Sequence, residues 1–245
     1  MRRLLGAVSL RSNHAESGRP AAALRRRAAA RCSPVAASMT LGAAVGVFGV
    51  SFGVLAVASG LSVAKTCALS LLVFTGASQF AAVGITGTGG SPLAAIASAL
   101  LLASRNGAYG LVLAPDIKGP RWRRLLAAQL VLDESTAMTA AQPDQRDRVR
   151  AFWATGLAIF VCWNIGTLLG ALGGGVIGDP AALGLDAAFP AGYLVLLAPH
   201  VRRLEGKVAA ALGAAIALVL VPLAPAGVPI IAAAGAAAIG CRRPS

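Results

Sequence analysis

Residues 39–60 read MTLGAAVGVFGVSFGVLAVASG, a stretch without a single charged side chain. About 20 apolar residues in a helix are enough to cross the hydrocarbon core of a bilayer. Glycines at positions 42, 46, 49 and 53 form two pairs with a spacing of small residues that lets another helix approach closely. The stretch therefore predicts a membrane-spanning helix whose glycine-lined face packs either within this chain or against a partner.

The rest of the chain has the same apolar character. Hydrophobic residues make up 57% of the 245 residues and charged residues only 13%, against roughly 25% in soluble proteins. Such a chain cannot cover a soluble core with polar side chains, so we expect an all-α, polytopic membrane domain over residues 39–245. We predict six to eight transmembrane or re-entrant helices, with further apolar stretches at residues 66–86, 93–114, 125–141, 152–177, 187–201, 208–223 and 228–241.

The formal net charge is +13: eight of the 22 lysine and arginine residues lie in the first 31 positions, and most of the others gather in short clusters between the apolar stretches. Such clusters anchor cytoplasmic loops, and no stripe of interleaved arginine and aromatic residues predicts a nucleic-acid surface. Residues 1–38 are rich in arginine and alanine, and we expect them to form a basic, disordered cytoplasmic extension without chemistry of its own. Both termini are predicted to face the cytoplasm.

The basic cluster at residues 118–124 conflicts with a simple alternation of spans. If the N-terminus lies inside and the stretches at 39–60, 66–86 and 93–114 all cross, this cluster lies outside, against the preference of Lys and Arg for cytoplasmic loops. Two resolutions stay open. Either the stretches at 93–114 and 125–141 both cross and one loop violates the rule, or both are re-entrant half-helices of the kind found near transporter sites.

Cysteine and histidine give no sign of a metal site or a cofactor. The four cysteines are far apart, with no CxxC pair and no neighbouring histidine, and the two histidines are His14 and His200. We therefore expect neither a zinc site nor a disulfide framework. The hydrolase motifs GxSxG and HExxH are missing as well, and no enzymatic activity is predicted.

Several motifs follow one another in a fixed order along the apolar region: SFGVLAVASGLS (51–62), VFTGASQFAAV (73–83), SRNGAYGLVLAP (104–115), VLDESTAM (131–138), GTLLGALGGGVIG (166–178) and LGLDAAFPAGYLVLLAP (183–199). Together they resemble the AzlC family, the large subunit of branched-chain amino acid exporters, from about residue 40 to about residue 204. The stretch SRNGAYG departs from the family's usual Asn-Leu-Arg-His form, so no role of that histidine is carried over.

The resemblance implies the substrate class, the partner and the location. It implies export of leucine, isoleucine and valine, with methionine as a further candidate. It also implies a small hydrophobic partner, an AzlD-like subunit, and a place in the cell membrane, which in a bacterium is the inner membrane.

An exported amino acid is a zwitterion, so its carboxylate and its ammonium group both need counter-charges inside the membrane. Ionisable residues in membrane segments are costly and are functional candidates by default. Arg105 suits a carboxylate, and Asp133 with Glu134 suits an ammonium group or a coupling proton, with Asp133 as the inward-facing member. The candidate set for substrate binding or coupling is completed by Gln79, Asn164 and Asp186.

Most of these candidates also have a structural interpretation. Asp133 and Glu134 could face water at the start of an interfacial helix, and Arg105 could reach the headgroups. Gln79 could join helices and Asp186 could cap one. Two other classes of function are an intramembrane aspartyl protease and a non-transporting membrane scaffold. The protease requires a GxGD motif, which the sequence before Asp186 lacks because position 182 is alanine.

Overall fold

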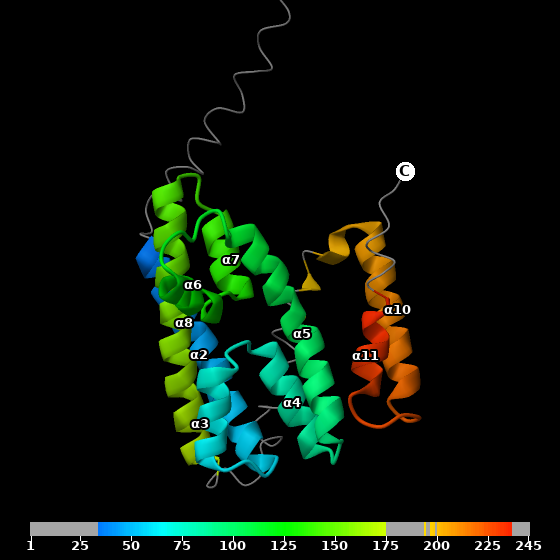
Figure 1. The fold of residues 1–245 in the computed structure, drawn as a ribbon. Helices are drawn as coiled ribbons and strands as arrows, with labels where there is room; N and C mark the ends of the chain where they lie inside the picture. The colour runs from blue at the N-terminus through cyan, green and yellow to red at the C-terminus, as the bar shows by residue number, and fades with distance from the viewer. Residues whose placement is uncertain (1–33, 175–193, 195–196, 199, 237–245) are drawn as a thin grey trace, which may run out of the picture.

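The computed structural model describes residues 34–174, 194, 197–198 and 200–236, and all regular structure within these residues is helical. Among these described residues, three helices are long and apolar enough to cross a membrane: α2 (Pro34–Ala58), α5 (Pro92–Leu113) and α8 (Gln145–Gly173). Figure 1 shows them with the shorter helices that lie between them in the sequence. The protein is therefore an all-α membrane protein, as its composition predicts.

α2 and α8 pack side by side and run in the same direction along a stripe of glycines. Gly42 lies against Ala158 and Gly49 against Trp163. A Cβ atom at Gly42 would stand 2.9 Å from Ala158, and one at Gly49 would stand 2.6 Å from the Trp163 carbonyl oxygen. Because a methyl group does not fit at these distances, only glycine permits this approach. The glycine-lined face predicted for residues 39–60 is thus occupied by a helix of the same chain.

The first helix starts earlier than expected. α2 begins at Pro34, inside the stretch assigned to the basic extension. Ser38 is fully buried there, and its hydroxyl oxygen lies 2.8 Å from Thr155 Oγ1 on α8. The last residues of that stretch are therefore part of the packed helix pair.

The second apolar stretch folds back on itself, so the single span predicted for residues 66–86 is wrong. It contains two short helices, α3 (Val63–Leu72) and α4 (Ala77–Gly87), joined by a reversal at residues 73–76. Gly87, at the end of α4, packs against Ser59, just after α2, so the hairpin enters and leaves at the same end of the molecule (Figure 1). Gly76 has a φ of +61° in the reversal, a backbone conformation that residues with a Cβ atom rarely adopt.

The fourth apolar stretch forms a second hairpin, which enters from the opposite end. It consists of α6 (Arg121–Gln129) and α7 (Asp133–Ala140). Asp116, before α6, and Arg148, in the first turn of α8, form an ion pair at 2.7 Å, so this hairpin also leaves where it enters. Neither arrangement considered for residues 93–114 and 125–141 holds in full. The first stretch is one continuous helix, α5, and only the second is re-entrant.

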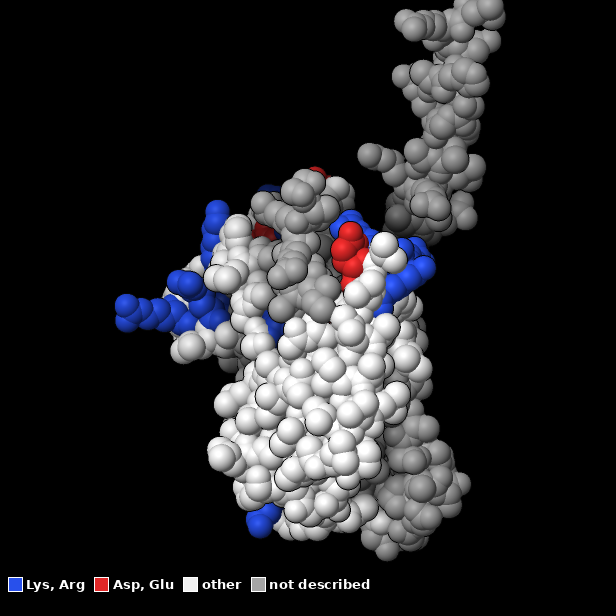
Figure 2. Space-filling model, turned by 90° about the vertical axis from the view of Figure 1, so that its right-hand side faces the viewer, with Lys and Arg blue, Asp and Glu red and all other residues white. Residues whose placement is uncertain are grey.

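This arrangement removes the conflict over the basic cluster at residues 118–124. Because the α3–α4 hairpin returns to its starting end, α5 crosses in the direction opposite to α2 and brings this cluster to the end where α2 begins. Residues 146–150, at the start of α8, lie there too. We call this end, marked by residues 118–124 and 146–150, the basic end. In Figure 2 most of the visible lysine and arginine gathers toward this end.

The tips of the two hairpins meet inside the molecule. Nε2 of Gln129, at the end of α6, donates a hydrogen bond to the Leu71 carbonyl oxygen of α3 at 2.9 Å. The buried tip residues 130–132 share one hydrophobic core with Phe74 and Phe80 of the other hairpin. α2 with the first hairpin and α5 with the second are therefore two helix–hairpin units of opposite direction. Inverted units with broken helices are common in secondary transporters.

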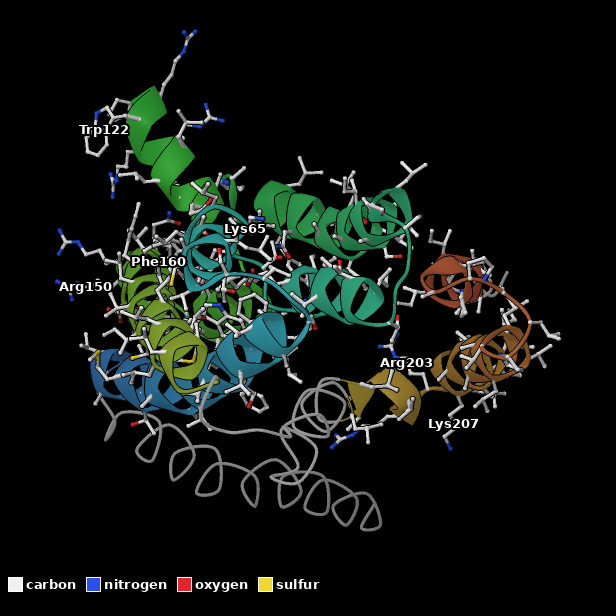
Figure 3. The ribbon with its side chains drawn as sticks, turned by 90° about the horizontal axis from the view of Figure 1, so that it is seen from below. Lys65, Trp122, Arg150, Phe160, Arg203 and Lys207 are labelled. Atoms are coloured by element: carbon white, nitrogen blue, oxygen red, sulfur yellow. The ribbon has the colours of Figure 1, made fainter. Side chains whose placement is uncertain are left out.

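The last described elements are the short 3-10 helix η2 (His200–Arg202), α10 (Leu204–Leu220) and α11 (Val228–Ala234). The Ser98 hydroxyl of α5 donates to the Gly227 carbonyl oxygen at 3.4 Å, which ties the start of α11 to the other helices. α10 packs mainly on α11 and η2, and Figure 3 shows these elements to one side. The helices predicted at 208–223 and 228–241 are confirmed in part, whereas the one at 187–201 lies largely outside the described residues.

Candidate functional site

Arg105 and Asp133, two of the predicted site residues, form an ion pair between α5 and α7. The Arg105 guanidinium lies 2.8 Å from Asp133 Oδ2, and the Tyr109 hydroxyl donates a hydrogen bond to Asp133 Oδ1 at 2.7 Å. Arg105 and Tyr109 are four residues apart on α5 and so share one face of that helix. The side chains of Arg105 and Asp133 are 29% and 19% exposed, which places the pair in a partly enclosed position at the hairpin.

The position of Asp133 explains how a carboxylate is held within an apolar hairpin. Asp133 is the first residue of α7, where the N–H groups have no partner within the helix and the helix dipole favours negative charge. Arg105 and Tyr109 contact different oxygens of the carboxylate. Removing a charge from water is costly unless that charge is paired and hydrogen-bonded. Asp133 meets both conditions.

Glu134 follows Asp133 in the sequence but is placed differently. Successive helical residues point about 100° apart, so Glu134 does not share the direction of its neighbour. Within the part of the chain that the structure describes, its carboxylate forms no ion pair. The two adjacent acids thus differ in their contacts, since of the two only Asp133 forms an ion pair within the described residues.

Gln79 holds the reversal of the first hairpin. It is fully buried, its Oε1 accepts a hydrogen bond from the Gly76 N–H at 3.1 Å, and its Nε2 donates to the Leu69 carbonyl oxygen at 3.2 Å. Both ends of the amide therefore pair with backbone groups that a reversal would otherwise leave unpaired. The structure brings Gln79 into the hairpin tip, where it joins α3 to α4.

Ser135 plays the same part in the second hairpin, and sequence reasoning missed it. Its Oγ accepts from the Leu132 N–H at 2.9 Å and donates to the Leu130 carbonyl oxygen at 2.7 Å. Ser135 and Gln79 are each the third residue of the returning helix in their hairpin. In each hairpin a polar residue stands three positions after the residue that precedes the returning helix. This spacing is the sequence signal that could have identified both reversals.

Asn164 belongs to a different polar cluster, between α3 and α8. Its Oδ1 accepts a hydrogen bond from the Ser70 hydroxyl at 2.7 Å, and its Nδ2 donates to the Phe160 carbonyl oxygen at 2.8 Å. The Ser70 hydroxyl also lies 3.2 Å from Thr167 Oγ1. The side chain of Asn164 is therefore bonded to α3 and to its own helix rather than to the ion pair.

Six buried polar side-chain atoms have no hydrogen-bond partner among the described residues, and two of them belong to the Asp116–Arg148 ion pair. The other four are Oγ1 of Thr66 on α3, Oγ of Ser78 in the first turn of α4, Oγ1 of Thr136 on α7 and Nε1 of Trp163 on α8. Buried polar groups are nearly always paired, so these atoms are candidate partners for a bound polar molecule. Sequence analysis did not select Thr66, Ser78 or Thr136, because a lone serine or threonine in an apolar stretch carries no signal of its own.

The remaining predicted site residue, Asp186, lies outside the described residues, so its role stays a prediction. Across residues 34–174 and 200–236, no three His, Cys, Asp or Glu side chains gather into a possible metal site. The site that the structure builds from the predicted residues is therefore the Arg105–Asp133 pair with Tyr109.

Comparison with known proteins gives a family match and two informative relatives. The family model described as AzlC protein matches residues 40–177, more than half of the chain and the whole run from α2 to α8 except its first turns. An uncharacterized membrane protein of Archaeoglobus fulgidus is 34% identical over 186 residues, which cover 75% of this chain and 81% of that protein. An uncharacterized membrane protein of Helicobacter pylori is 27% identical over 179 residues, which cover 72% and 78%. No solved structure matches the chain.

Proposed function

Because this chain belongs to the AzlC family, we propose that it is the permease subunit of an exporter that carries branched-chain, neutral amino acids across the cell membrane as a secondary transporter. The observation that carries the proposal is the Arg105–Asp133 ion pair on a re-entrant hairpin. Ionisable residues inside membrane proteins mark the pathways of substrates and ions. A scaffold without transport has no need of such a pair.

The ion pair supplies both charges that a zwitterionic amino acid requires. In our mechanism the substrate carboxylate replaces Asp133 on the forked guanidinium of Arg105, and the substrate ammonium group replaces Arg105 beside Asp133. One internal pair is exchanged for two pairs with the substrate, so the bound state leaves no charge unpaired in the apolar interior. The Tyr109 hydroxyl, bonded to Asp133, keeps that carboxylate oriented in both states.

Glu134 is the carboxylate that we assign to ion coupling. The sequence interpretation favoured Asp133 for the inward role and Glu134 for a structural or loop-facing one. Since Asp133 is already paired with Arg105, the proton-exchanging role passes to Glu134, which forms no ion pair in the described region. Both acids begin α7, so a proton taken up by Glu134 acts on the same half-helix that holds the substrate contact.

The orientation that we propose places the basic end in the cytoplasm. Residues 118–124 and 146–150 flank the α6–α7 hairpin at that end, and Lys and Arg are strongly enriched in cytoplasmic loops. With this orientation α2 begins inside, in agreement with a cytoplasmic N-terminal extension. The α6–α7 hairpin then enters from the cytoplasm and the α3–α4 hairpin from the outside.

An AzlD-like subunit remains part of the proposal on the strength of the family alone. The glycine-lined face of α2 was one possible docking surface for it, but Gly42 and Gly49 pack against α8. The partner therefore docks on another surface of the chain. An intramembrane aspartyl protease gains no support from the described residues, among which Asp133 pairs with Arg105 and with no second aspartate.

The direct test is amino acid efflux from cells that lack other exporters of the class. Leucine, isoleucine, valine and methionine efflux is measured with this chain alone, the small subunit alone, and both together. We expect efflux above background only with both chains. No efflux from cells that hold both chains in the membrane at normal abundance would contradict the proposed activity, and full efflux from this chain alone would contradict the need for a partner.

A further inference from the structure

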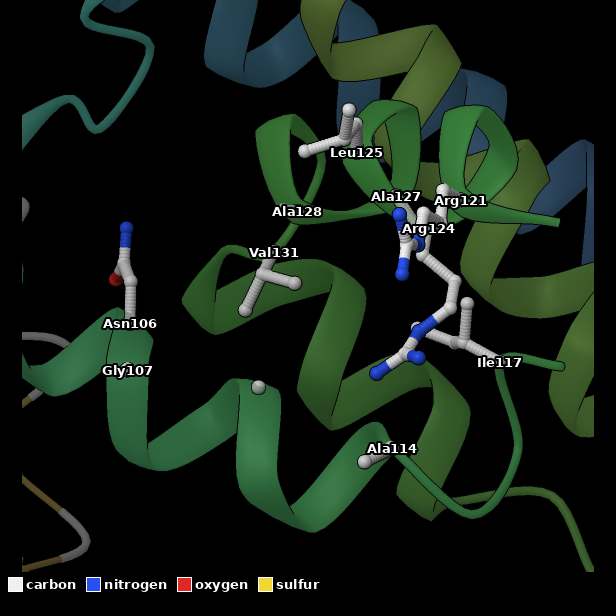
Figure 4. Close-up of a pocket in the computed structure, with 11 residues that line it drawn as sticks. Asn106, Gly107, Ala114, Ile117, Arg121, Arg124, Leu125, Ala127, Ala128 and Val131 are labelled. Carbon is white, nitrogen blue, oxygen red and sulfur yellow. The ribbon is translucent and has the colours of Figure 1, made fainter. Parts of the chain in front are cut away.

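A groove of about 620 Å³ lies between α5 and α6 at the basic end (Figure 4). Gly107 and Gly110 form part of its α5 wall, and a Cβ atom added at either position would meet no other atom within 4 Å. Leu125, Ala128 and Val131 form the wall contributed by α6 and the tip of its hairpin. The groove is therefore mostly apolar and is open along the side of α5.

Two arginines line the same groove without partners of their own. Within the described chain, Arg121 and Arg124 form no ion pair and no hydrogen bond through their side chains. Figure 4 shows them together on α6, with arginine side chains reaching over the groove toward Ala114 and Ile117. Arg123, between them, is engaged elsewhere: it donates to the Lys118 carbonyl oxygen at 3.1 Å and lies 5.6 Å from the ring centroid of Trp153.

The surroundings of the two arginines resemble a membrane interface. Trp122, next to Arg121, is 62% exposed, and tryptophan is enriched at the boundary between headgroups and hydrocarbon. Of the described residues, no aspartate or glutamate lines the groove, so among them the ammonium group of a zwitterion would find only like charges there. An apolar channel with two free guanidinium groups at its interfacial end instead fits a molecule with an anionic head and a hydrocarbon tail.

We propose that this groove binds an anionic phospholipid, with its phosphate on Arg121 and Arg124 and one acyl chain along Gly107 and Gly110. Basic pockets between membrane helices on the cytoplasmic side are suited to anionic headgroups. Asn106, which lines the groove, is the neighbour of Arg105, and α6 is the first helix of the hairpin that carries Asp133. A bound lipid thus braces α5 against the α6–α7 hairpin, the two elements that the ion pair joins.

The test compares thermal unfolding of the purified chain in vesicles of phosphatidylcholine with that in vesicles of equal parts phosphatidylcholine and phosphatidylglycerol. We expect the midpoint to rise by several degrees with phosphatidylglycerol. The double variant Arg121→Gln/Arg124→Gln should lose this gain. The double variant Arg146→Gln/Arg150→Gln should keep it, because it removes the same charge from the same end of the molecule but outside the groove.

A second variant tests the acyl-chain part of the site with a substitution that should not destabilise the fold. Gly110→Leu fills the groove where a Cβ atom meets open space, and leucine favours a helix more than glycine does. Its midpoint in phosphatidylcholine should therefore equal or exceed that of the unchanged chain, while its gain from phosphatidylglycerol should disappear. A lower midpoint for Gly110→Leu than for the unchanged chain in phosphatidylcholine alone would mean that phosphatidylcholine also binds in the groove. That result would overturn the requirement for an anionic headgroup.

Three further results would overturn the proposal. Equal gains in the groove double variant and the unchanged chain would show that Arg121 and Arg124 bind no headgroup. Equal losses in both double variants would show a general effect of surface charge. Stabilisation by free leucine that Gly110→Leu abolishes, without any preference for phosphatidylglycerol, would assign the groove to the substrate path instead.

Discussion

Asp133 accepts two interactions at once, from the Arg105 guanidinium at 2.8 Å and from the Tyr109 hydroxyl at 2.7 Å. Sequence analysis selected Arg105 and Asp133 separately, because an ionisable residue within an apolar membrane stretch is costly and is therefore a functional candidate. It did not select Tyr109 as a site residue, since a tyrosine in a membrane helix is common and its hydroxyl partner depends on how α5 meets α7. That Arg105 pairs with Asp133 depends on tertiary structure, and it cannot be read from the two separate stretches of sequence.

At this scale we predict that Asp133→Asn abolishes most of the transport. Removing one partner of a buried ion pair costs about 3–5 kcal/mol, and less where the pair is partly exposed, as it is here. Arg105 would then lack its counter-charge and the substrate ammonium group would lack its contact. Leucine efflux should fall more than about tenfold, since each 1.4 kcal/mol corresponds to a factor of ten.

The matched control for this variant is Asp144→Asn, the same change at an exposed residue before α8. It should export normally. Membrane abundance is measured for both variants, so that loss of protein is not taken for loss of transport. Normal export by Asp133→Asn at unchanged abundance would return Asp133 to the role of a solvated residue at a helix start.

At the scale of the elements, the hairpins mark the limit of what the sequence predicts. Hydropathy reports whether residues prefer the membrane, and residues 66–86 are apolar enough to cross it. It does not report direction, which here depends on the positive φ of Gly76 and on the side chain of Gln79. The long apolar stretches at 39–60, 93–114 and 152–177 were predictable because a continuous helix satisfies its own backbone without help from side chains.

Ser135→Ala should destabilise the second hairpin. The buried Leu132 N–H would lose its side-chain acceptor and the Leu130 carbonyl oxygen a donor. A buried group left unpaired costs about 1–3 kcal/mol, so the thermal midpoint of the purified protein should drop measurably. Ser104→Ala is the control, because the Ser104 hydroxyl binds only the carbonyl oxygen of Leu101 in an exposed position. Equal midpoints for the two variants would mean that Ser135 does not hold the reversal.

A second prediction at this scale concerns the close contact between α2 and α8. Gly49→Ala places a methyl group 2.6 Å from the Trp163 carbonyl oxygen, so the two backbones must separate. Overpacking of this kind typically costs about 1–3 kcal/mol, and we expect lower yield of folded protein by size-exclusion chromatography in detergent. Gly84→Ala, where the added atom meets nothing within 4 Å, should behave as the unchanged chain. A Gly49→Ala protein as stable as Gly84→Ala would show that the helices are farther apart.

At the scale of the whole molecule, two helix–hairpin units of opposite direction place their tips against each other. Gln129 of one tip donates a hydrogen bond to the Leu71 carbonyl oxygen of the other, so the two tips lie at the same depth. No repeat is visible in the sequence, because the two reversals use different residues, Gln79 and Ser135, for the same bonds. Movement of one hairpin against the other is the simplest route by which such a chain could open alternately to each side.

Removal of residues 1–33 should leave insertion and export unchanged. α2 begins at Pro34 and already includes Ser38, whose hydroxyl oxygen lies 2.8 Å from Thr155 Oγ1. A chain shortened to begin at Met39 would lose that contact and should be less stable. Efflux and membrane abundance of the two shortened chains, measured side by side, check this boundary. Loss of export at normal abundance after removal of residues 1–33 alone would assign the extension a function.

The most direct test of the central claim is competition for leucine counterflow into proteoliposomes that contain this chain with its small subunit. If the substrate replaces both members of the Arg105–Asp133 pair, a competitor needs both of its own charges. Isoleucine and valine should therefore compete with labelled leucine. N-acetyl-leucine, which lacks the ammonium group, and leucinamide, which lacks the carboxylate, should not. Equal competition by leucine and by either of these single-charge analogues would contradict the exchange of an internal ion pair for a zwitterion.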